Sequence, residues 1–416
     1  MRPSIIERNA ASARYTMRYG RKLLRAFDSS RFRTTLKPLP LADWVARQRQ
    51  RARKHGGVTG ALLAEPDDHR LCSAERGCNP QPILMLVTVR PLVSVVTPVH
   101  NGEPYLRECI ESVLAQAYQH WDYTIVNNCS TDRTLEIAHE YAATDPRIRI
   151  WNSETFVRVE QNYNNAFRQI SAESKYCKVV AADDWLFPEC LEKMVGLAEE
   201  HPNVAIVGAY GLLGERVHCQ GLPYPSTSVS GRDMCRERLL GGPYIFGTPT
   251  SLLFRSDIVR SRHAFFNESN FHCDSEACLE VLEHHDFGFV HQVLNFQRVR
   301  EQSLTSFAQT MQTYLSGFLL EVVKYGPKYL SAEEQEFRID ELLRRYYRFL
   351  GEQIYNRRDQ EFWNYHKKQL AALGYPMSLP RLTAAATSHA LEFVNGKRIV
   401  KGVLWPLRRR FTMASR

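Results

Sequence analysis

Short apolar runs and amphipathic stretches alternate along the chain between residues 92 and 209. The apolar runs are rich in β-branched residues and end at polar clusters, which is typical of buried strands. The stretches between them repeat apolar side chains at intervals of three and four residues, the spacing of a helix with one buried face. We expect strands at 92–97, 123–126, 148–150, 176–181 and 205–209, and helices at 105–117, 132–143, 160–172 and 188–200.

Regular alternation of this kind predicts an α/β fold in which helices cover both faces of a mostly parallel sheet. The pattern is less regular from 230 to 304, and residues 310–370 are again rich in Leu, Glu, Arg and Tyr at helical spacing. We therefore expect three parts. They are a basic N-terminal extension at 1–90, partly helical or disordered, a sheet domain at 91–308, and a helical C-terminal region at 309–416 with a basic amphipathic tail.

The charge is concentrated at the two ends of the sequence. Residues 1–55 carry +12 and residues 396–416 carry +7, so the total of +9 leaves −10 for the chain between them. Basic ends favour a polyanion, either nucleic acid or an anionic membrane surface. No finger or aromatic-interleaved motif accompanies the charge, so we do not expect nucleic-acid binding. The C-terminal segment contains Leu404, Trp405, Leu407 and Arg408–Arg410. This pattern is typical of an interfacial membrane anchor and equally of a solvated basic tail.

The sequence also bears on the compartment. No apolar stretch approaches the roughly 20 residues of a membrane-spanning helix, and the first 25 residues contain no apolar signal core. None of the ten cysteines forms a C-x-x-C pair, which argues against a zinc ribbon or a thioredoxin-like site and favours buried reduced thiols. We expect a cytoplasmic protein. Its basic ends leave two alternatives open, which are peripheral association with the cytoplasmic face of a membrane and solvated tails without a partner.

Three polar clusters follow expected strands: 99–103, 127–132 and the pair Asp183 and Asp184. Because ligands bind outside the carboxyl ends of parallel strands, we expect these clusters to share one site. Neither a G-x-G-x-x-G nor a G-x-x-x-x-G-K-[ST] motif is present, which argues against a Rossmann dinucleotide site and a P-loop. Two adjacent carboxylates repel each other unless a cation or a hydrogen-bond donor compensates, so Asp183 and Asp184 favour a hard divalent cation.

Three segments, in this order and spacing, resemble the inverting glycosyltransferases of family 2, which have the GT-A fold. They are Val93–Asn101 with Tyr105–Gln116, then Ile125–Asp132, then Ala182–Pro188. A further segment around Asp274 extends the resemblance to about residues 91–305. The resemblance implies a GT-A glycosyltransferase domain at 91–308, with a Rossmann-like, mostly parallel sheet flanked by helices.

The same resemblance implies a substrate class. An inverting enzyme would move a sugar from a nucleotide sugar, with a UDP-sugar as the expected donor, to a hydroxyl of a glycan or lipid-linked acceptor. Surface or cell-envelope glycan synthesis is the expected setting. In this family the loop after the first strand lies against the base and ribose, here Pro98, Val99 and Asn101. Asn128 stands where the family carries a base-reading aspartate, and Ala182 replaces the first aspartate of the metal motif.

The resemblance also assigns roles to charged residues. It places Asp184 on a Mg²⁺ or Mn²⁺ ion and Asp183 on the ribose or the same ion. Inversion requires a base that takes the proton of the acceptor hydroxyl, and Asp274 is the best match, with Glu276 as the alternative. Arg300 stands where many members carry a histidine, and its guanidinium could bind the departing diphosphate.

Two other classes of function are alternatives to an active glycosyltransferase. A nucleotidyltransferase would need a loop rich in Gly, Lys and Arg after the first strand, whereas residues 98–104 contain no Lys or Arg. A catalytically inactive member of the same family would bind a nucleotide sugar or act as a scaffold. The departures at Asn127, Asn128 and Ala182 favour this alternative.

Overall fold

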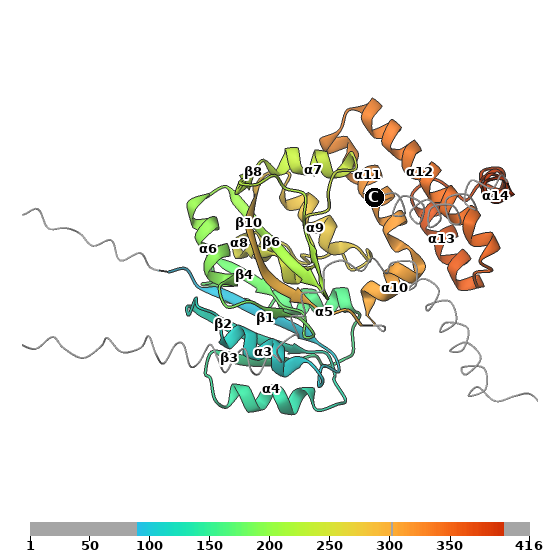
Figure 1. The fold of residues 1–416 in the computed structure, drawn as a ribbon. Coiled ribbons are helices and arrows are strands. Elements are labelled where there is room, and N and C mark those ends of the chain that lie inside the picture. The colour runs from blue at the N-terminus through green and yellow to red at the C-terminus, as the bar shows by residue number, and fades with distance from the viewer. Residues whose placement is uncertain (1–89, 301–302, 395–416) are drawn as a thin grey trace, which may run out of the picture. The chain divides into compact units, whose positions relative to one another are not determined.

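The computed structural model describes residues 90–300 and 303–394 (Figure 1). The expectations for the N-terminal extension and for the basic tail after residue 394 lie outside the described residues. The residues described below all belong to one compact unit.

Within the described residues, ten strands form one mixed sheet with the order β3-β2-β1-β4-β9-β6-β10-β5, in which β7 pairs with β6 and β8 with β10. Strands β3, β2, β1 and β4 run parallel, as do β6 and β10, and β9 joins the two groups in antiparallel pairing. The strands are β1 Val93–Val99, β2 Trp121–Asn127, β3 Ile148–Asn152, β4 Tyr176–Val179, β5 Trp185–Leu186, β6 Val204–Leu213, β7 Arg216–His218, β8 Ser228–Val229, β9 Leu253–Arg255 and β10 Asp286–Gln297.

Helices cover both faces of this sheet, and a helical region follows it in the chain. The helices are α3 Leu106–Leu114, α4 Thr134–Ala142, α5 Val159–Phe167, α6 Cys190–Glu200, α7 Gly231–Leu239, the 3₁₀ turn η1 Pro249–Ser251, α8 Ser256–Arg260, α9 Cys273–Val281, α10 Leu304–Met311, α11 Thr313–Tyr329, α12 Ala332–Tyr355, α13 Gln360–Ala372 and α14 Leu379–Val394.

The predicted α/β fold with its mostly parallel sheet and helical C-terminal region is confirmed. All five expected strands and all four expected helices are present, although α5 ends at Phe167 and not at 172. After the helix, the backbone N–H of Ser171 donates to the hydroxyl of Ser94 in β1, so residue 171 is held by the sheet and not by a helical turn. The antiparallel strand β9 lies within residues 230–304, where the pattern of apolar and polar positions is less regular.

Two apolar cores lie on the opposite faces of the sheet, because successive side chains of a strand point to opposite sides. Val95 of β1 belongs to the core that includes α3, α4 and α6. Val96, its neighbour, belongs to the core that includes α5, α7, α9 and α11. The second core continues into the C-terminal region: Leu319 of α11 is fully buried in the same cluster as Leu279 of α9. Helix α11 is therefore packed onto the sheet domain, as Figure 1 shows.

Two further observations concern the helices and the cysteines. Among the helices of residues 90–300 and 303–394, none combines the length and the apolar character needed to cross a membrane. The eight cysteines of this part of the chain are all free thiols, seven of them buried and Cys129 partly exposed.

Candidate functional site

A cavity of about 1260 Å³ lies at the carboxyl ends of β1, β2 and β4. The loops after these strands form one side of it, and η1, α9 and α11 form the other. Seven of the eight residues expected from the sequence line this cavity: Pro98, Val99, Asn128, Asp183, Asp184, Asp274 and Arg300. Segments separated by up to about 200 residues in the chain are thus brought to one site.

Asn101, the eighth expected residue, does not line the cavity. Its side-chain oxygen accepts a hydrogen bond from the backbone N–H of Thr131 at 2.8 Å, and its own N–H donates to the hydroxyl of Ser130 at 2.9 Å. The residue is exposed and has a φ of 51°, in the left-handed region that asparagine tolerates better than most residues. Asn101 therefore joins the loops that follow β1 and β2. Its expected contact with the nucleotide sugar stays a prediction.

Asn128 lines the cavity, but its polar atoms are already used. Its amide nitrogen donates to the carbonyl of Val157 at 2.8 Å, and its amide oxygen accepts from the N–H of Val157 at 2.9 Å. The residue is 2% exposed, so breaking this pair would leave buried polar groups without partners. In this structure Asn128 holds the loop before α5. The contact between Asn128 and a base that the sequence leads us to expect stays a prediction.

The loop held by Asn128 carries an aromatic residue that the sequence analysis did not single out. Phe156 is 63% exposed and lines the cavity, and the ring of His100 packs against it edge-on at 4.8 Å. The Nδ1 atom of His100 lies 2.7 Å from the carbonyl oxygen of Asn128. An exposed ring beside a polar cavity offers a surface on which a planar base could stack. The signal in the sequence was an aromatic residue in an otherwise polar loop.

Asp184 is the more deeply buried carboxylate of the expected metal motif, with 6% of its surface exposed. Its Oδ2 accepts from the hydroxyl of Thr250 at 2.6 Å, and its Oδ1 accepts from the backbone N–H of Arg298 at 3.1 Å. Burial, together with the negative charge of Asp183, raises the pKa of Asp184 to about 7 despite these two donors. A cation placed against Asp184 would offset both effects.

Thr250 is held in place by a buried lysine. Lys178 of β4 is fully buried, and its Nζ donates to the carbonyls of Thr250 at 2.6 Å and Leu252 at 3.0 Å. The hydroxyl of Thr250 also accepts from the N–H of Ala181. Lys178 thus fixes the turn η1, and η1 presents Thr250 to Asp184.

Asp183 and two arginines surround the same edge of the cavity. The Nη2 atom of Arg300 lies 2.6 Å from Oδ2 of Asp183, and Arg298 donates to the carbonyl of Asp183 and pairs with Glu108. The Nε atom of Arg300 is buried and has no hydrogen-bond partner in the described part of the chain. A phosphate oxygen could supply that partner, as expected for Arg300.

The described residues fit a divalent ion that is shared with a diphosphate. Within residues 90–300 and 303–394, no group of three or more His, Cys, Asp or Glu side chains is placed to hold a metal ion. Asp183 and Asp184 therefore offer at most two carboxylates, and one of them is paired with Arg300. Mg²⁺ and Mn²⁺ bound to nucleotides take many of their oxygen ligands from phosphate and water. Such an ion therefore suits a site in which the protein supplies at most two carboxylates.

Asp274 lies near the start of α9 and lines the cavity. Its Oδ1 accepts from the backbone N–H of Ser275 at 2.8 Å, and no other residue of the described ranges donates to its Oδ2. Burial raises the pKa of Asp274 to about 6. A carboxylate with this pKa and one unengaged oxygen is suited to take a proton near neutral pH.

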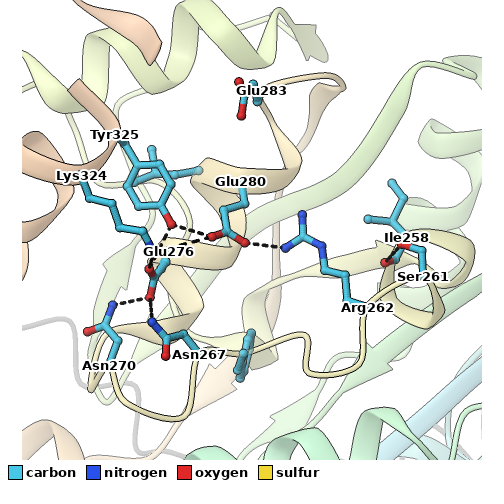
Figure 2. Close-up of polar contacts among 12 residues, drawn as sticks. Ile258, Ser261, Arg262, Asn267, Asn270, Glu276, Glu280, Glu283, Lys324 and Tyr325 are labelled. Atoms are coloured by element: carbon cyan, nitrogen blue, oxygen red, sulfur yellow. Dashed lines mark hydrogen bonds and ion pairs between the residues drawn. The ribbon is translucent and has the colours of Figure 1, made fainter. Parts of the chain in front are cut away.

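Glu276, the alternative base, is occupied elsewhere (Figure 2). It is 3% exposed and does not line the cavity. Its carboxylate is paired with Lys324 of α11 and accepts hydrogen bonds from Asn267, Asn270 and Tyr325. Burial alone would raise its pKa, but the contacts with Lys324 and Asn270 outweigh burial and lower it. Glu276 thus joins α9 to α11, and of the two candidate bases only Asp274 lines the cavity.

The acidic pair Asp183 and Asp184 lies near enough to Asp274 for all three charges to affect the pKa of one side chain. Tyr163 of α5 lines the cavity, and its pKa is raised first by burial and then by the charges of Asp184, Asp183 and Asp274. The expected metal motif and the expected base therefore share one neighbourhood, as a reaction between two bound molecules requires.

Comparisons with known proteins agree with this geometry. Residues 94–259 match the model of the family described as Glycosyl transferase family 2. EpsE of Bacillus subtilis (strain 168), whose name assigns it provisionally to the glycosyltransferases, is 32% identical over 158 residues, which cover 36% of this chain and 56% of EpsE. TuaG of the same strain, named provisionally as a teichuronic acid biosynthesis glycosyltransferase, is 32% identical over 126 residues, which cover 30% of this chain and 49% of TuaG. The match thus spans about half the length of each relative.

A solved structure shares the fold. The crystal structure of S. aureus TarS 1-349 in complex with UDP-GlcNAc superposes with a TM-score of 0.52 at 18% sequence identity, covering 68% of this chain and 80% of that one. The likeness extends beyond the residues matched by the family model. Residues 94–259 are thus similar to the family 2 glycosyltransferases, and the solved structure shows that the likeness in fold covers 68% of this chain.

Proposed function

We propose that this protein transfers a sugar from a nucleotide sugar to a hydroxyl group of an acceptor, with inversion at the anomeric carbon. The observation that carries the proposal is the cavity itself. It combines the acidic pair Asp183 and Asp184 with Asp274, a separate carboxylate whose pKa is about 6. Residues 91–308 would form the catalytic domain, to which the helical region from 309 contributes one wall through α11.

The donor would bind at the strand-end side of the cavity. Its base would lie against Pro98, Val99 and the exposed ring of Phe156, because these groups form the apolar part of that side. Its diphosphate would lie at Asp183, Asp184 and Arg300. A Mg²⁺ or Mn²⁺ ion bound there would neutralise charge that develops on the leaving diphosphate. A UDP-sugar is the donor class we favour, and the solved relative TarS was crystallised with UDP-GlcNAc.

The transfer itself would need one proton acceptor from the protein. The acceptor oxygen forms a bond to the anomeric carbon, and the bond from that carbon to the diphosphate oxygen breaks. The proton of the acceptor hydroxyl passes to Asp274, and the nucleoside diphosphate leaves with the bonding electron pair. Arg300 can stabilise the charge on the leaving oxygens, and its unpartnered Nε is a donor for this purpose.

The test is the release of nucleotide by the purified protein from UDP-, GDP- and dTDP-sugars, with and without Mn²⁺. We expect turnover of one donor, with strong loss in Asp274→Asn. Glu276→Gln is a matched control because it alters a carboxylate of the same helix that does not line the cavity. Silence across the panel together with no thermal shift by UDP or GDP would refute the proposal.

A catalytically inactive, nucleotide-binding member of the family is the second candidate. Asn128 favours it, because the position that would read the base is engaged by Val157. Ala182 adds to it by removing one carboxylate from the motif. Binding of a nucleotide with a measurable thermal shift, without turnover of any donor in the presence of Mn²⁺, would support this candidate.

The setting that we propose is surface or cell-envelope glycan synthesis on the cytoplasmic side of a membrane. Support comes from TuaG, which is named for teichuronic acid biosynthesis, and from the basic ends of the sequence. Sedimentation with vesicles of phosphatidylcholine, with and without phosphatidylglycerol, tests the membrane part. Binding that does not depend on the anionic lipid would contradict it.

A further inference from the structure

The cavity is larger than the donor requires. Most small-molecule sites occupy about 300–1,000 Å³, and this one measures about 1260 Å³. The residues assigned to the donor lie on the strand-end side. Beyond Asp274, the cavity continues between α9 and α11, and we call this part the α11 chamber. It is lined by Tyr244, Phe271, His272, Tyr314, Phe318 and Glu321.

One face of α11 forms the far wall of the chamber. Tyr314, Gly317, Phe318 and Glu321 all line the cavity, and their spacing of three and four residues puts them on one side of the helix. The helix is seated closely because Gly317 has no side chain: a Cβ atom there would lie 2.5 Å from the ring of His272. His272 also contacts Thr313 of α11, with 3.0 Å between its Nε2 and the threonine hydroxyl.

The wall is aromatic over much of its area. The ring of Tyr314 lies 5.1 Å from His272 and 6.3 Å from Phe318. Tyr244 faces the same space from the loop after α7, and its hydroxyl lies 3.0 Å from that of Ser275. Side chains of this type present an apolar face and a polar tip. They suit a ligand with a flat C–H face and hydroxyl edges, which describes a sugar ring.

A buried carboxylate closes the chamber. Glu321 is 6% exposed and forms an ion pair with Arg238 of α7 at 2.9 Å. Asp274 borders the chamber, because it lines the same cavity as Tyr314 and Glu321 and its neighbour Ser275 contacts the hydroxyl of Tyr244. The only cation in direct contact with Glu321 among the described residues is Arg238, and the pair cancels its own charge. Asp274 therefore leaves the chamber with a negative field, which disfavours an anionic ligand.

We propose that the α11 chamber binds the acceptor, and that the reacting unit of the acceptor is a neutral sugar ring packed on Tyr314 and hydrogen-bonded by Glu321. This inference rests on the proposed function. The proposed function leaves a glycan and a lipid-linked acceptor both open. The inference specifies the group that carries the reacting hydroxyl in either case. A neutral sugar satisfies the carboxylate of Glu321 by donating from its hydroxyls, whereas a phosphate or a uronic acid beside Asp274 would be repelled.

The experiment measures nucleotide release from the donor that the protein turns over, in the presence of defined probes. The probes are p-nitrophenyl glycosides of neutral hexoses and N-acetylhexosamines, p-nitrophenyl glucuronide, and geranyl phosphate. We expect at least one neutral glycoside to raise the rate tenfold or more over water, and the glucuronide and geranyl phosphate to raise it less than twofold. Glu321→Gln and Tyr314→Leu should raise the KM for the active glycoside by about tenfold or more with a smaller change in kcat.

Two controls keep the outcomes distinct. The thermal shift produced by UDP should be the same in both variants as in the unchanged protein, which shows that they fold and retain the nucleotide side. Glu283 follows α9 in the chain, is ion-paired with Lys328 and does not line the cavity. Glu283→Gln should therefore leave the KM for the glycoside unchanged. Donor hydrolysis without stimulation by any neutral glycoside, stimulation by geranyl phosphate instead, or an unchanged KM in both variants would overturn the inference. Absence of any nucleotide turnover would overturn the proposed function as well.

Discussion

The hydrogen bond between Thr250 and Asp184 gives the sharpest physical prediction. Thr250→Val removes the hydroxyl that donates to Asp184 at 2.6 Å and keeps the branched shape of the side chain. Asp184 then retains one donor, the backbone N–H of Arg298. The hydroxyl matters most when Asp184 is ionised, because a hydrogen bond to a charged acceptor is stronger than one to a neutral acid.

The magnitude follows from two constants. A hydrogen bond to a charged group contributes about 1.5–3 kcal/mol, and one pKa unit corresponds to about 1.4 kcal/mol. The pKa of Asp184, about 7 in the folded protein, should therefore rise by about one to two units in Thr250→Val. A folded-state pKa above the unfolded value means that stability is present below the unfolded pKa and is lost as pH rises through the folded pKa. For the variant, this loss extends beyond pH 7, to between about pH 8 and pH 9.

The assay is thermal unfolding of the metal-free protein at pH 6 and at pH 9. At pH 6, Asp184 is largely protonated in both proteins, and the deficit of Thr250→Val should be mainly the pH-independent cost of leaving the N–H of Ala181 without its acceptor. At pH 9, the deficit of the variant should grow by about 1.5–3 kcal/mol, or roughly 3–6 °C in Tm at about 2 °C per kcal/mol. Thr250→Ser keeps the hydroxyl and should show no such growth. An equal deficit at both pH values would refute the reasoning, because the hydroxyl would then not be sensing the charge of Asp184.

Three further predictions concern the same site. Asp274→Asn should lower turnover by about 10²- to 10⁴-fold. In the unchanged protein, turnover should fall as the pH drops through about 6, because Asp274 must be ionised to take a proton. A pH–rate profile without this fall on the acidic side would contradict the role of Asp274 as the base. Glu276→Gln, which weakens the contact with Lys324, should lower Tm while leaving turnover within a few-fold, and a loss as large as that of Asp274→Asn would show that the base is misassigned. Asn128→Asp should lower stability by about 1–3 kcal/mol in chemical denaturation, because a carboxylate cannot donate to the carbonyl of Val157, and an unchanged stability would mean that this pair is not formed.

The sequence predicted those parts of the fold that depend on local patterns. Val93–Val99 is a strand because its side chains are apolar and β-branched, and the cluster after it falls at the edge of the sheet because the strands are parallel. The division between Asp274 and Glu276 is also local in origin. Two residues apart on a helix, they point about 200° from each other, so only one can face the cavity. The sequence alone did not indicate which of the two faces the cavity, because that depends on the orientation of α9.

The roles that could not be predicted depend on contacts between distant segments. Asn128 is occupied by Val157, 29 residues away, and Asn101 by Thr131, 30 residues away, and no residue pattern indicates such pairs. The hydroxyl of Thr250 reaches Asp184 across 66 residues. Glu321 belongs to a helix whose own pattern indicates only packing. Its place in the cavity follows from the docking of α11, which requires the whole fold.

The central claim is that Asp274 serves an inverting transfer, and the stereochemistry of the first product tests it most directly. Proton NMR can follow the anomeric signal of the sugar released from an α-linked nucleotide sugar at early times, before mutarotation mixes the anomers. The account predicts that the β anomer is formed first, and that Asp274→Asn releases sugar at least about a hundredfold more slowly than Glu276→Gln. Initial release of the α anomer, or full activity in Asp274→Asn, would contradict it.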